Sequence, residues 1–212
     1  MQKKTKFNWV LDPRKCLSKK EALRLIRTAK LSAEKALSKK QKIAFRDYFV
    51  IDLALSTGLR VMEISQLNCS DLFLNGKTFF ILVKKGKGNK SRLVQVSRQF
   101  RKHCLQYLIW KDSIGESTEP SAPLILSSNT KRHITTRALQ NVFKKAAACA
   151  NLDSHYSIHC LRHTYACLLY KASNYNLRLV QKQLGHASIK TTQVYADVMA
   201  PDAARAIEKL WD

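Results

Sequence analysis

Two β-rich runs interrupt a sequence that otherwise has helical character. TFFILV at 78–83 and RLVQV at 92–96 are separated by KKGKGNKS, a link with two glycines and an asparagine. Such a link predicts an antiparallel hairpin with a flexible tip, and DLFL at 71–74 is a candidate third strand. The sequence therefore predicts a mainly α fold with one small antiparallel sheet, of the α+β class.

Helical segments lie on both sides of the hairpin. Ser18 with Glu21 three residues later is a capping-box pattern before an apolar run. Residues 40–56 are apolar on most faces, which predicts a buried central helix that ends at Gly58, before a short helix carrying VMEISQL. Further helices are expected at 98–111, 135–150, 158–172, 176–184, 188–195 and 201–211, with a loop at 115–123.

Charge is the strongest signal in the composition. The 212 residues include 38 Lys and Arg against 15 Asp and Glu, a net charge of +23. This excess predicts a polyanionic partner, above all nucleic acid, with a ribosome-associated or membrane-surface protein as the alternatives. The start of the chain lacks the apolar core of a signal peptide, no apolar run is long enough to span a bilayer, and the six cysteines form no CxxC pair. We therefore expect reduced thiols and a cytoplasmic protein.

Four short stretches carry polar side chains that suit one chemistry. They contribute Arg60 in STGLRVMEISQL, Lys87 at the hairpin tip, His159 and Arg162 in SIHCLRHTYA, and His186 and Tyr195 in LGHASIKTTQVYADV. His159 and Arg162, three residues apart, share one helix face, opposite an expected core-facing stripe of Ile158, Leu161, Tyr165 and Leu168. With Ser157 as N-cap, both fall in the first helical turn, where the helix dipole favours a phosphate.

These side chains match the needs of phosphodiester cleavage without a metal. Two guanidiniums can clamp the nonbridging oxygens of one phosphate and stabilise charge in the transition state. Tyrosine can attack the phosphorus, an imidazole can take its proton, and an ammonium can protonate the departing 5′-oxygen. Because the ordinary pKa of tyrosine is about 10, the nucleophile needs nearby positive charge and a base.

The order and spacing of these motifs resemble the tyrosine recombinase (phage integrase) family. TGLRxxE, GKGNK, HxLRHT, and LGH followed by Tyr nine residues later cover about residues 18–205. The resemblance implies a clamp of Arg60 and Arg162, Lys87 as general acid, His159 as general acid/base, His186 as a hydrogen-bond donor to the phosphate, and Tyr195 as nucleophile. Glu63 and His163 would be supporting residues that orient the arginine loop and the helix start.

The same resemblance implies a function. It is site-specific DNA recombination through a 3′-phosphotyrosyl link, with double-stranded DNA as partner and no cofactor, ATP or metal. A homotetramer on a DNA synapse, a monomer free in solution and accessory DNA-bending proteins are the expected assemblies. The DNA site and the outcome (integration, excision, inversion or resolution) stay open. The alternatives are a type IB topoisomerase and a non-catalytic, sequence-specific DNA-binding protein.

The domain plan expected from the sequence is simple. Residues 1–17 are a basic arm and 18–212 a catalytic domain, without the separate amino-terminal domain of many family members. In this the chain is similar in size to the short fimbrial-switch inverting recombinases. The tail at 200–212 is expected as a helix, either packed on its own core or docked on the next protomer.

Six further basic residues are candidates for DNA contact: Lys84, Lys85, Lys90, Arg92, Arg137 and Lys144. Each site residue also has a purely structural interpretation. Arg60 can form a salt bridge to Glu63, the hairpin tip can be a solvated turn, and Tyr195 can be a packing residue. His159 and His163 can be satisfied helix-start histidines, or zinc ligands with Cys160 and Cys167, although the spacing is not typical of a metal site.

The net charge leads to a first prediction. If many phosphates are neutralised on binding, affinity for DNA falls steeply as salt is raised from low to moderate concentration, since counterion release weakens. Titration of labelled duplex DNA at several salt concentrations measures this slope. A flat response would contradict the charge argument.

Overall fold

The computed structural model of the chain describes residues 15–38, 42–84 and 91–199. Its elements, in chain order, are α1 Lys19–Ser38, α2 Lys42–Thr57, α3 Val61–Ser65, the 3-10 turn η2 Cys69–Asp71, β1 Leu72–Phe73, β2 Phe79–Val83, β3 Arg92–Val96, α4 Arg98–Ser113, α5 Thr136–Cys149, α6 His159–Ala172, α7 Leu177–Leu184 and α8 Lys190–Met199. The expected hairpin tip with Lys87 and the expected tail helix lie outside the described residues.

The expected capping box opens α1. Ser18 N donates to Glu21 Oε2 at 2.8 Å, and Glu21 N donates to Ser18 Oγ at 3.2 Å, so two orphan N–H groups are satisfied reciprocally. The end of the expected amino-terminal arm is not free, however. Leu17 is buried, and its N–H donates to Thr164 Oγ1 of α6 at 2.9 Å. The arm therefore joins the core at its last residue.

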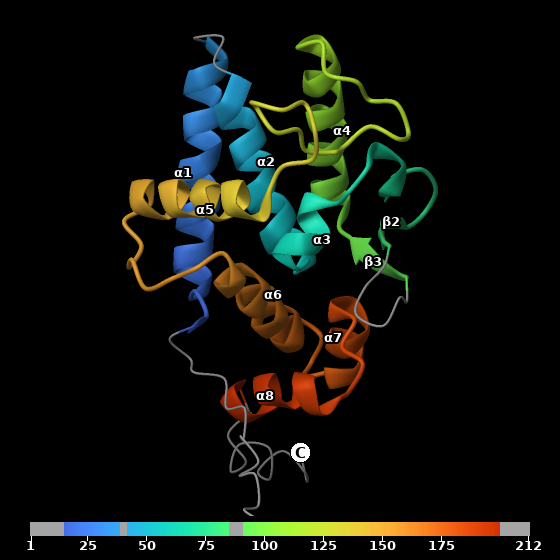
Figure 1. Cartoon of the computed structure of the whole chain (residues 1–212). Helices are drawn as coiled ribbons and strands as arrows, with labels where there is room; N and C mark the ends of the chain where they lie inside the picture. The colour runs from blue at the N-terminus through green and yellow to red at the C-terminus, as the bar shows by residue number, and fades with distance from the viewer. Residues whose placement is uncertain (1–14, 39–41, 85–90, 200–212) are drawn as a thin grey trace, which may run out of the picture.

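Helix α2 is the central helix, as its apolar sequence predicted. Phe49, Val50, Ile51 and Leu53 are fully buried and point to different sides of the helix. α2 packs against α1, α4, α5 and α6, and Figure 1 shows α1, α2 and α4 side by side, with α5 crossing α1 and α2. From Phe49 to Ala54 every residue of α2 is buried, which explains why this part is apolar on most faces, whereas the first turns, with Lys42, Arg46 and Asp47, are exposed or half-buried.

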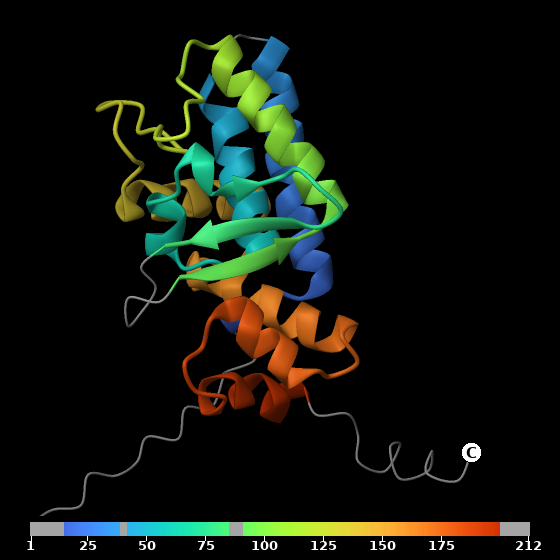
Figure 2. The ribbon, with the colours of Figure 1, turned by 90° about the vertical axis from the view of Figure 1, so that its right-hand side faces the viewer.

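The small sheet covers one side of these helices (Figure 2). Its order is β1-β2-β3, all antiparallel, and Ile81 pairs with Leu72 on one side and with Val94 on the other. Ile81, Val83 and Val94 face the core and are buried. The strand β1 is only Leu72–Phe73, because Asp71 ends the preceding 3-10 turn and Leu74 no longer pairs with β2. The strand expected over 71–74 was therefore too long.

Two apolar clusters divide the core, and α6 runs from one to the other. Ile158, Cys160 and Leu161 belong to the larger cluster, whereas Ala166 and Cys167 belong to a smaller one with α7 and α8. Burial around most of the helix follows from this position. The expected single stripe was wrong for Leu168, which is half-buried and belongs to neither cluster, whereas Tyr165 is partly buried against the smaller one.

The start of α6 also differs from the expectation. Ile158, not Ser157, precedes the first helical residue, and it has helical angles of φ −55° and ψ −24° with no side-chain cap. Ser157 contributes its carbonyl, which accepts from Cys160 N at 2.8 Å. The chain thus enters α6 through a helical turn rather than an extended N-cap.

Gly58 provides a test of the fold. At φ +62°, a Cβ added here would lie 2.3 Å from Tyr165 Cδ1 of α6. We expect Gly58→Ala to lower the free energy of unfolding by about 3 kcal/mol, from backbone strain and overpacking together. Gly115→Ala is the matched control, since Gly115 has φ +78° with open space around it. This substitution should lower the free energy of unfolding by only about 1 kcal/mol, from backbone strain alone. Equal losses in urea denaturation would contradict the packing argument.

Candidate active site

Arg60 stands at the start of α3, two residues after the glycine that ends α2. Its backbone N–H donates to Glu63 Oε2 at 2.8 Å, and its Nη1 donates to Glu63 Oε1 at 3.0 Å. Glu63 is buried, whereas the Arg60 side chain is 36% exposed. Glu63 therefore contacts both the backbone and the side chain of Arg60, and the salt bridge considered from the sequence is present.

Arg162 is buried in the first turn of α6. Its Nη1 donates to Gly58 O at 2.6 Å and its Nη2 to Leu184 O at 2.9 Å. Burial, and then the charge of Arg60, lower the pKa of Arg162 to about 10, so it stays charged at neutral pH. The guanidinium is thus fixed between the ends of α2 and α7, with N–H groups left over for a ligand.

His186 follows Gly185, which ends α7 in the left-handed conformation at φ +65°. Its Nδ1 lies 2.9 Å from Thr192 Oγ1, and Thr192 is fully buried. Burial, and then Arg162 and Arg60, lower the pKa of His186 to about 4. The imidazole is therefore neutral at pH 7, and when Nδ1 accepts from Thr192 the proton is on Nε2.

Tyr195 of α8 is 2% exposed and lies against two imidazoles. Its hydroxyl is 3.1 Å from His163 Nδ1, and its ring centroid is 6.0 Å from that of His163 and 6.4 Å from that of His186. Burial raises the pKa of Tyr195 to about 12, although Arg162 acts in the opposite direction. In this arrangement the phenol holds its proton.

The two histidines of α6 have different positions. His159, the first residue of the helix, is exposed, whereas His163 is half-buried. Burial, and then Arg162 and His159, lower the pKa of His163 to about 4. The described hydrogen bond of His163 is to Tyr195, and its expected role in orienting the helix start stays a prediction.

Two thiols lie beneath the tyrosine. Cys16 Sγ and Cys167 Sγ are 3.6 Å apart, although 151 residues separate them in the sequence. Cys167 packs in the same apolar cluster as Tyr195, and both thiols contribute to the raised pKa of Tyr195. The end of the amino-terminal arm therefore takes part in enclosing the nucleophile candidate.

The candidates for DNA contact separate into three groups. Arg137 and Lys144 are exposed on α5, where a polyanion can reach them. Lys84 pairs with the buried Asp71, and Arg92 pairs with Glu63. Lys85 and Lys90, like the general-acid candidate Lys87, are outside the described residues.

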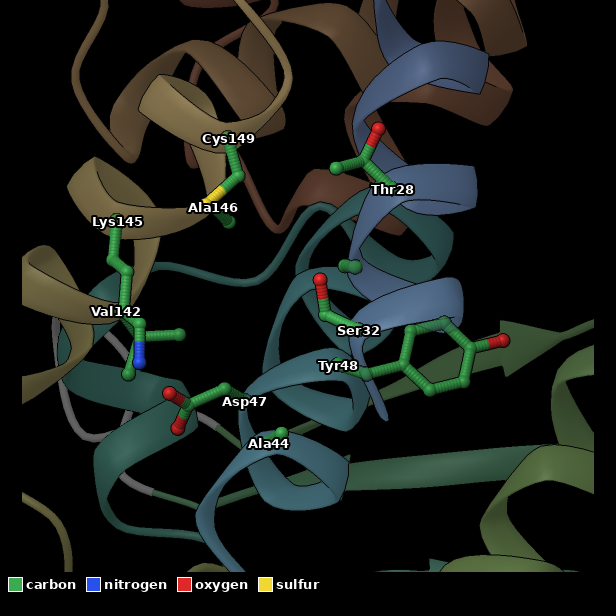
Figure 3. Close-up of a pocket in the computed structure, with 10 residues that line it drawn as sticks. Thr28, Ser32, Ala44, Asp47, Tyr48, Val142, Lys145, Ala146 and Cys149 are labelled. Atoms are coloured by element: carbon green, nitrogen blue, oxygen red, sulfur yellow. The ribbon is translucent and has the colours of Figure 1, made fainter. Parts of the chain in front are cut away.

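A hollow between α1, α2 and α5 lies apart from these residues (Figure 3). Thr28 and Ser32 line it from α1, Asp47 and Tyr48 from α2, and Lys145 from α5. None of the described candidate catalytic residues is in its lining. In the described ranges, no group of three or more His, Cys, Asp or Glu side chains gathers as metal ligands, and no helix has the length and apolar character to cross a membrane.

Several contacts of the site have no signal in the sequence. Thr192 is one of two adjacent threonines, and nothing local distinguishes the one that meets His186. The carbonyls of Gly58 and Leu184 belong to the backbone, which carries no residue-type signal at all. These partners depend on how helices far apart in the chain come together.

Comparison with known proteins identifies relatives of the chain as a whole. The model of the phage integrase family matches residues 15–201. The chain belongs to the phage integrase family. This integrase-family chain is 37% identical over 165 residues to the tyrosine recombinase XerC of Caldanaerobacter subterraneus subsp. tengcongensis, covering 77% of the chain and 44% of the relative. It is 33% identical over 167 residues to XerD of Rickettsia bellii, covering 74% and 53%.

The integrase-family chain thus spans about half the length of these curated relatives. Among solved structures it is similar to the XerA recombinase, with a TM-score of 0.68 and 26% identity over 91% of this chain and 63% of that one. The XerH recombinase bound to its difH substrate shares the fold, with a TM-score of 0.69 and 24% identity over 93% and 53%. The expected fold class, mainly α with a small antiparallel sheet, is confirmed.

The two neutral histidines predict how stability depends on pH. Their folded pKa of about 4 lies below the value of about 6.5 in an unfolded chain. Between these values the unfolded state binds more protons, so the free energy of unfolding falls as pH drops from 6.5 toward 4. We measure the free energy of unfolding by denaturant titration at half-unit pH steps. Its dependence on pH between 6.5 and 4 should be shallower in the double variant His163→Gln/His186→Gln than in wild type. An exposed-histidine control, His133→Gln, should keep the wild-type slope.

Proposed function

We propose that this chain is the catalytic part of a site-specific DNA recombinase that breaks and rejoins strands through a tyrosine. One observation carries the proposal: a buried tyrosine beside two neutral imidazoles and a buried, twice-anchored arginine. The family motifs in register and relatives that are tyrosine recombinases support it. The same relatives favour recombination over the relaxation activity of a topoisomerase.

The two arginines suit a phosphate clamp. Arg162 uses one N–H of each terminal nitrogen on carbonyls, and Arg60 uses Nη1 on Glu63. A guanidinium has five N–H donors, so each keeps donors for nonbridging oxygens. Since these donors are fixed before the substrate arrives, they stabilise charge that develops at phosphorus without reorganisation.

The covalent step uses Tyr195. Its phenolic oxygen attacks phosphorus, forming the O–P bond of a 3′-phosphotyrosyl link while the bond to the 5′-oxygen breaks. The phenolic proton passes to an imidazole: His159 by family resemblance, with His163 already at hydrogen-bond distance in this structure. Lys87 would protonate the departing 5′-oxygen, and His186 would donate its Nε2–H to a nonbridging oxygen.

Rejoining reverses the step with a 5′-hydroxyl of the partner duplex. The phosphodiester bond energy is kept in the tyrosyl link, so the residues need no nucleotide cofactor. Double-stranded DNA is the partner, and a tetramer on a synapse with accessory DNA-bending proteins stays a prediction, as does the cytoplasmic location. Residues 18–212 would form the catalytic domain, with residues 200–212 docking in cis or in trans.

The decisive experiment traps the covalent link. Wild type should form a protein–DNA adduct on nicked fragments that span the DNA around its own gene, with mass spectrometry locating the linkage at Tyr195. Tyr195→Phe should abolish the adduct and keep DNA binding. Tyr170→Phe is the matched control, because Tyr170 is buried in the same apolar cluster, and it should still form the adduct.

Two outcomes would contradict the proposal. An adduct that survives Tyr195→Phe would place the nucleophile elsewhere. Specific binding by wild type with no adduct on any fragment would favour the alternative of a sequence-specific DNA-binding protein.

A further inference from the structure

Arg92 does not extend toward solvent as a DNA-contacting arginine would. It begins β3, and its side chain is only 14% exposed. Its guanidinium lies against the carboxylate of Glu63, with Nη1 2.8 Å from Oε1 and Nη2 2.9 Å from Oε2. This two-point geometry is the strongest pairing that an arginine and a carboxylate can form.

The stem of the same side chain packs against the turn that carries His186. A Cβ added at Gly185 would lie 2.4 Å from Arg92 Cδ, so only glycine leaves room for the arginine. A second contact joins the same elements, since Gln95 N of β3 donates to Gln183 Oε1 of α7 at 3.2 Å. Arg92 therefore touches both the residue that holds Arg60 and the residue before His186.

The acceptor sites of Glu63 are fully used. Oε1 accepts from Arg60 Nη1 and Arg92 Nη1, and Oε2 accepts from Arg60 N and Arg92 Nη2. A carboxylate offers about four lone-pair positions. Because Arg92 occupies half of them, Arg60 is left with one side-chain contact to Glu63, and its other N–H groups stay available.

We propose that Arg92 is a positioning residue, which limits Arg60 to a single contact with Glu63 and sets the place of the His186 turn, and that it is not a phosphate contact. The inference rests on the proposed function. Without Arg92, the vacated lone pairs of Glu63 would draw Arg60 into a two-point ion pair and withdraw it from the phosphate. A cavity beside Gly185 would at the same time loosen the turn that carries His186.

The first test separates positioning from DNA contact. For wild type and Arg92→Ala, the salt dependence of DNA affinity and the rate of adduct formation in the saturated complex are both measured. We expect an unchanged salt slope and an adduct rate that falls at least roughly tenfold, since the loss is in orientation rather than in binding. Arg92→Lys should recover only part of the rate, because an ammonium cannot make the two-point contact.

Arg137→Ala is the comparison for a phosphate contact, since Arg137 is exposed on α5. It should reduce the salt slope by about one. If Arg92→Ala gives that reduction while the saturated complex reacts at the wild-type rate, Arg92 binds phosphate and the inference is wrong, although the proposed function stands. If wild type itself forms no adduct, the proposed function fails first.

The pH dependence of the adduct rate distinguishes a positioning role of Arg92 from a merely structural one, because a structural role would leave it unchanged. Three arginines act on the charge of Glu63, namely Arg60 of its own turn, Arg92 of β3 and Arg162 of α6, and the ion pair of Lys84 with Asp71 lines the same cavity as Glu63. Burial alone would raise the pKa of Glu63, but hydrogen bonds from Arg92 and from the Arg60 backbone bring it down to about 2. Removing Arg92 should raise this pKa, so protonation of Glu63 would release Arg60 at a higher pH.

In Arg92→Ala the adduct rate should therefore rise as the pH falls through the raised pKa of Glu63, because Arg60 is freed from the ion pair, and this rise should vanish in Arg92→Ala/Glu63→Gln. If Arg92→Ala does not fold, the same measurements are made on Arg92→Gln, which keeps part of the arginine stem but lacks the guanidinium. Superimposable pH profiles for wild type and the folded variant would overturn the inference.

Discussion

The arrangement of the site depends on one buried cation. A charge taken out of water is costly unless its hydrogen bonds are replaced, and Arg162 finds two replacements in Gly58 O and Leu184 O. Both carbonyls stand at the ends of helices, where the last carbonyls lack helical partners and the dipole is negative. One side chain of α6 thus satisfies the ends of α2 and α7. Whatever follows those ends, Arg60 in one case and His186 in the other, is fixed relative to Arg162.

Two glycines make this convergence sterically feasible. Gly58 and Gly185 each turn the chain out of a helix in the left-handed region, and each leaves the volume of a missing Cβ to a side chain from elsewhere. Tyr165 fills the first space and Arg92 fills the second. At both helix ends, the same glycine therefore permits the sharp turn and the close packing of a side chain from another element.

Burial sorts the charges of the site. It raises the pKa of Tyr195 and lowers those of His163 and His186, so the tyrosine and both imidazoles are neutral, while Arg162 keeps its charge. The resting site is thus an array of guanidinium donors around uncharged proton carriers. Such an array suits an anionic substrate, because the guanidiniums of Arg60, Arg92 and Arg162 outnumber the single carboxylate of Glu63, and the substrate would stabilise an imidazolium when a proton moves.

The sequence by itself determined the elements and most residue types of the site. Apolar periodicity, the capping box at Ser18 and the two glycines are local signals, and Arg60 and His186 each stand within two positions of such a glycine. Only the tertiary structure decided which polar groups meet. The pairing of Tyr195 with His163, of His186 with Thr192, and of Arg92 with Glu63 joins separate elements, and neither spacing nor periodicity encodes such contacts. The same limit explains the errors at α6: its expected single stripe assumed one core, whereas the helix lies between two.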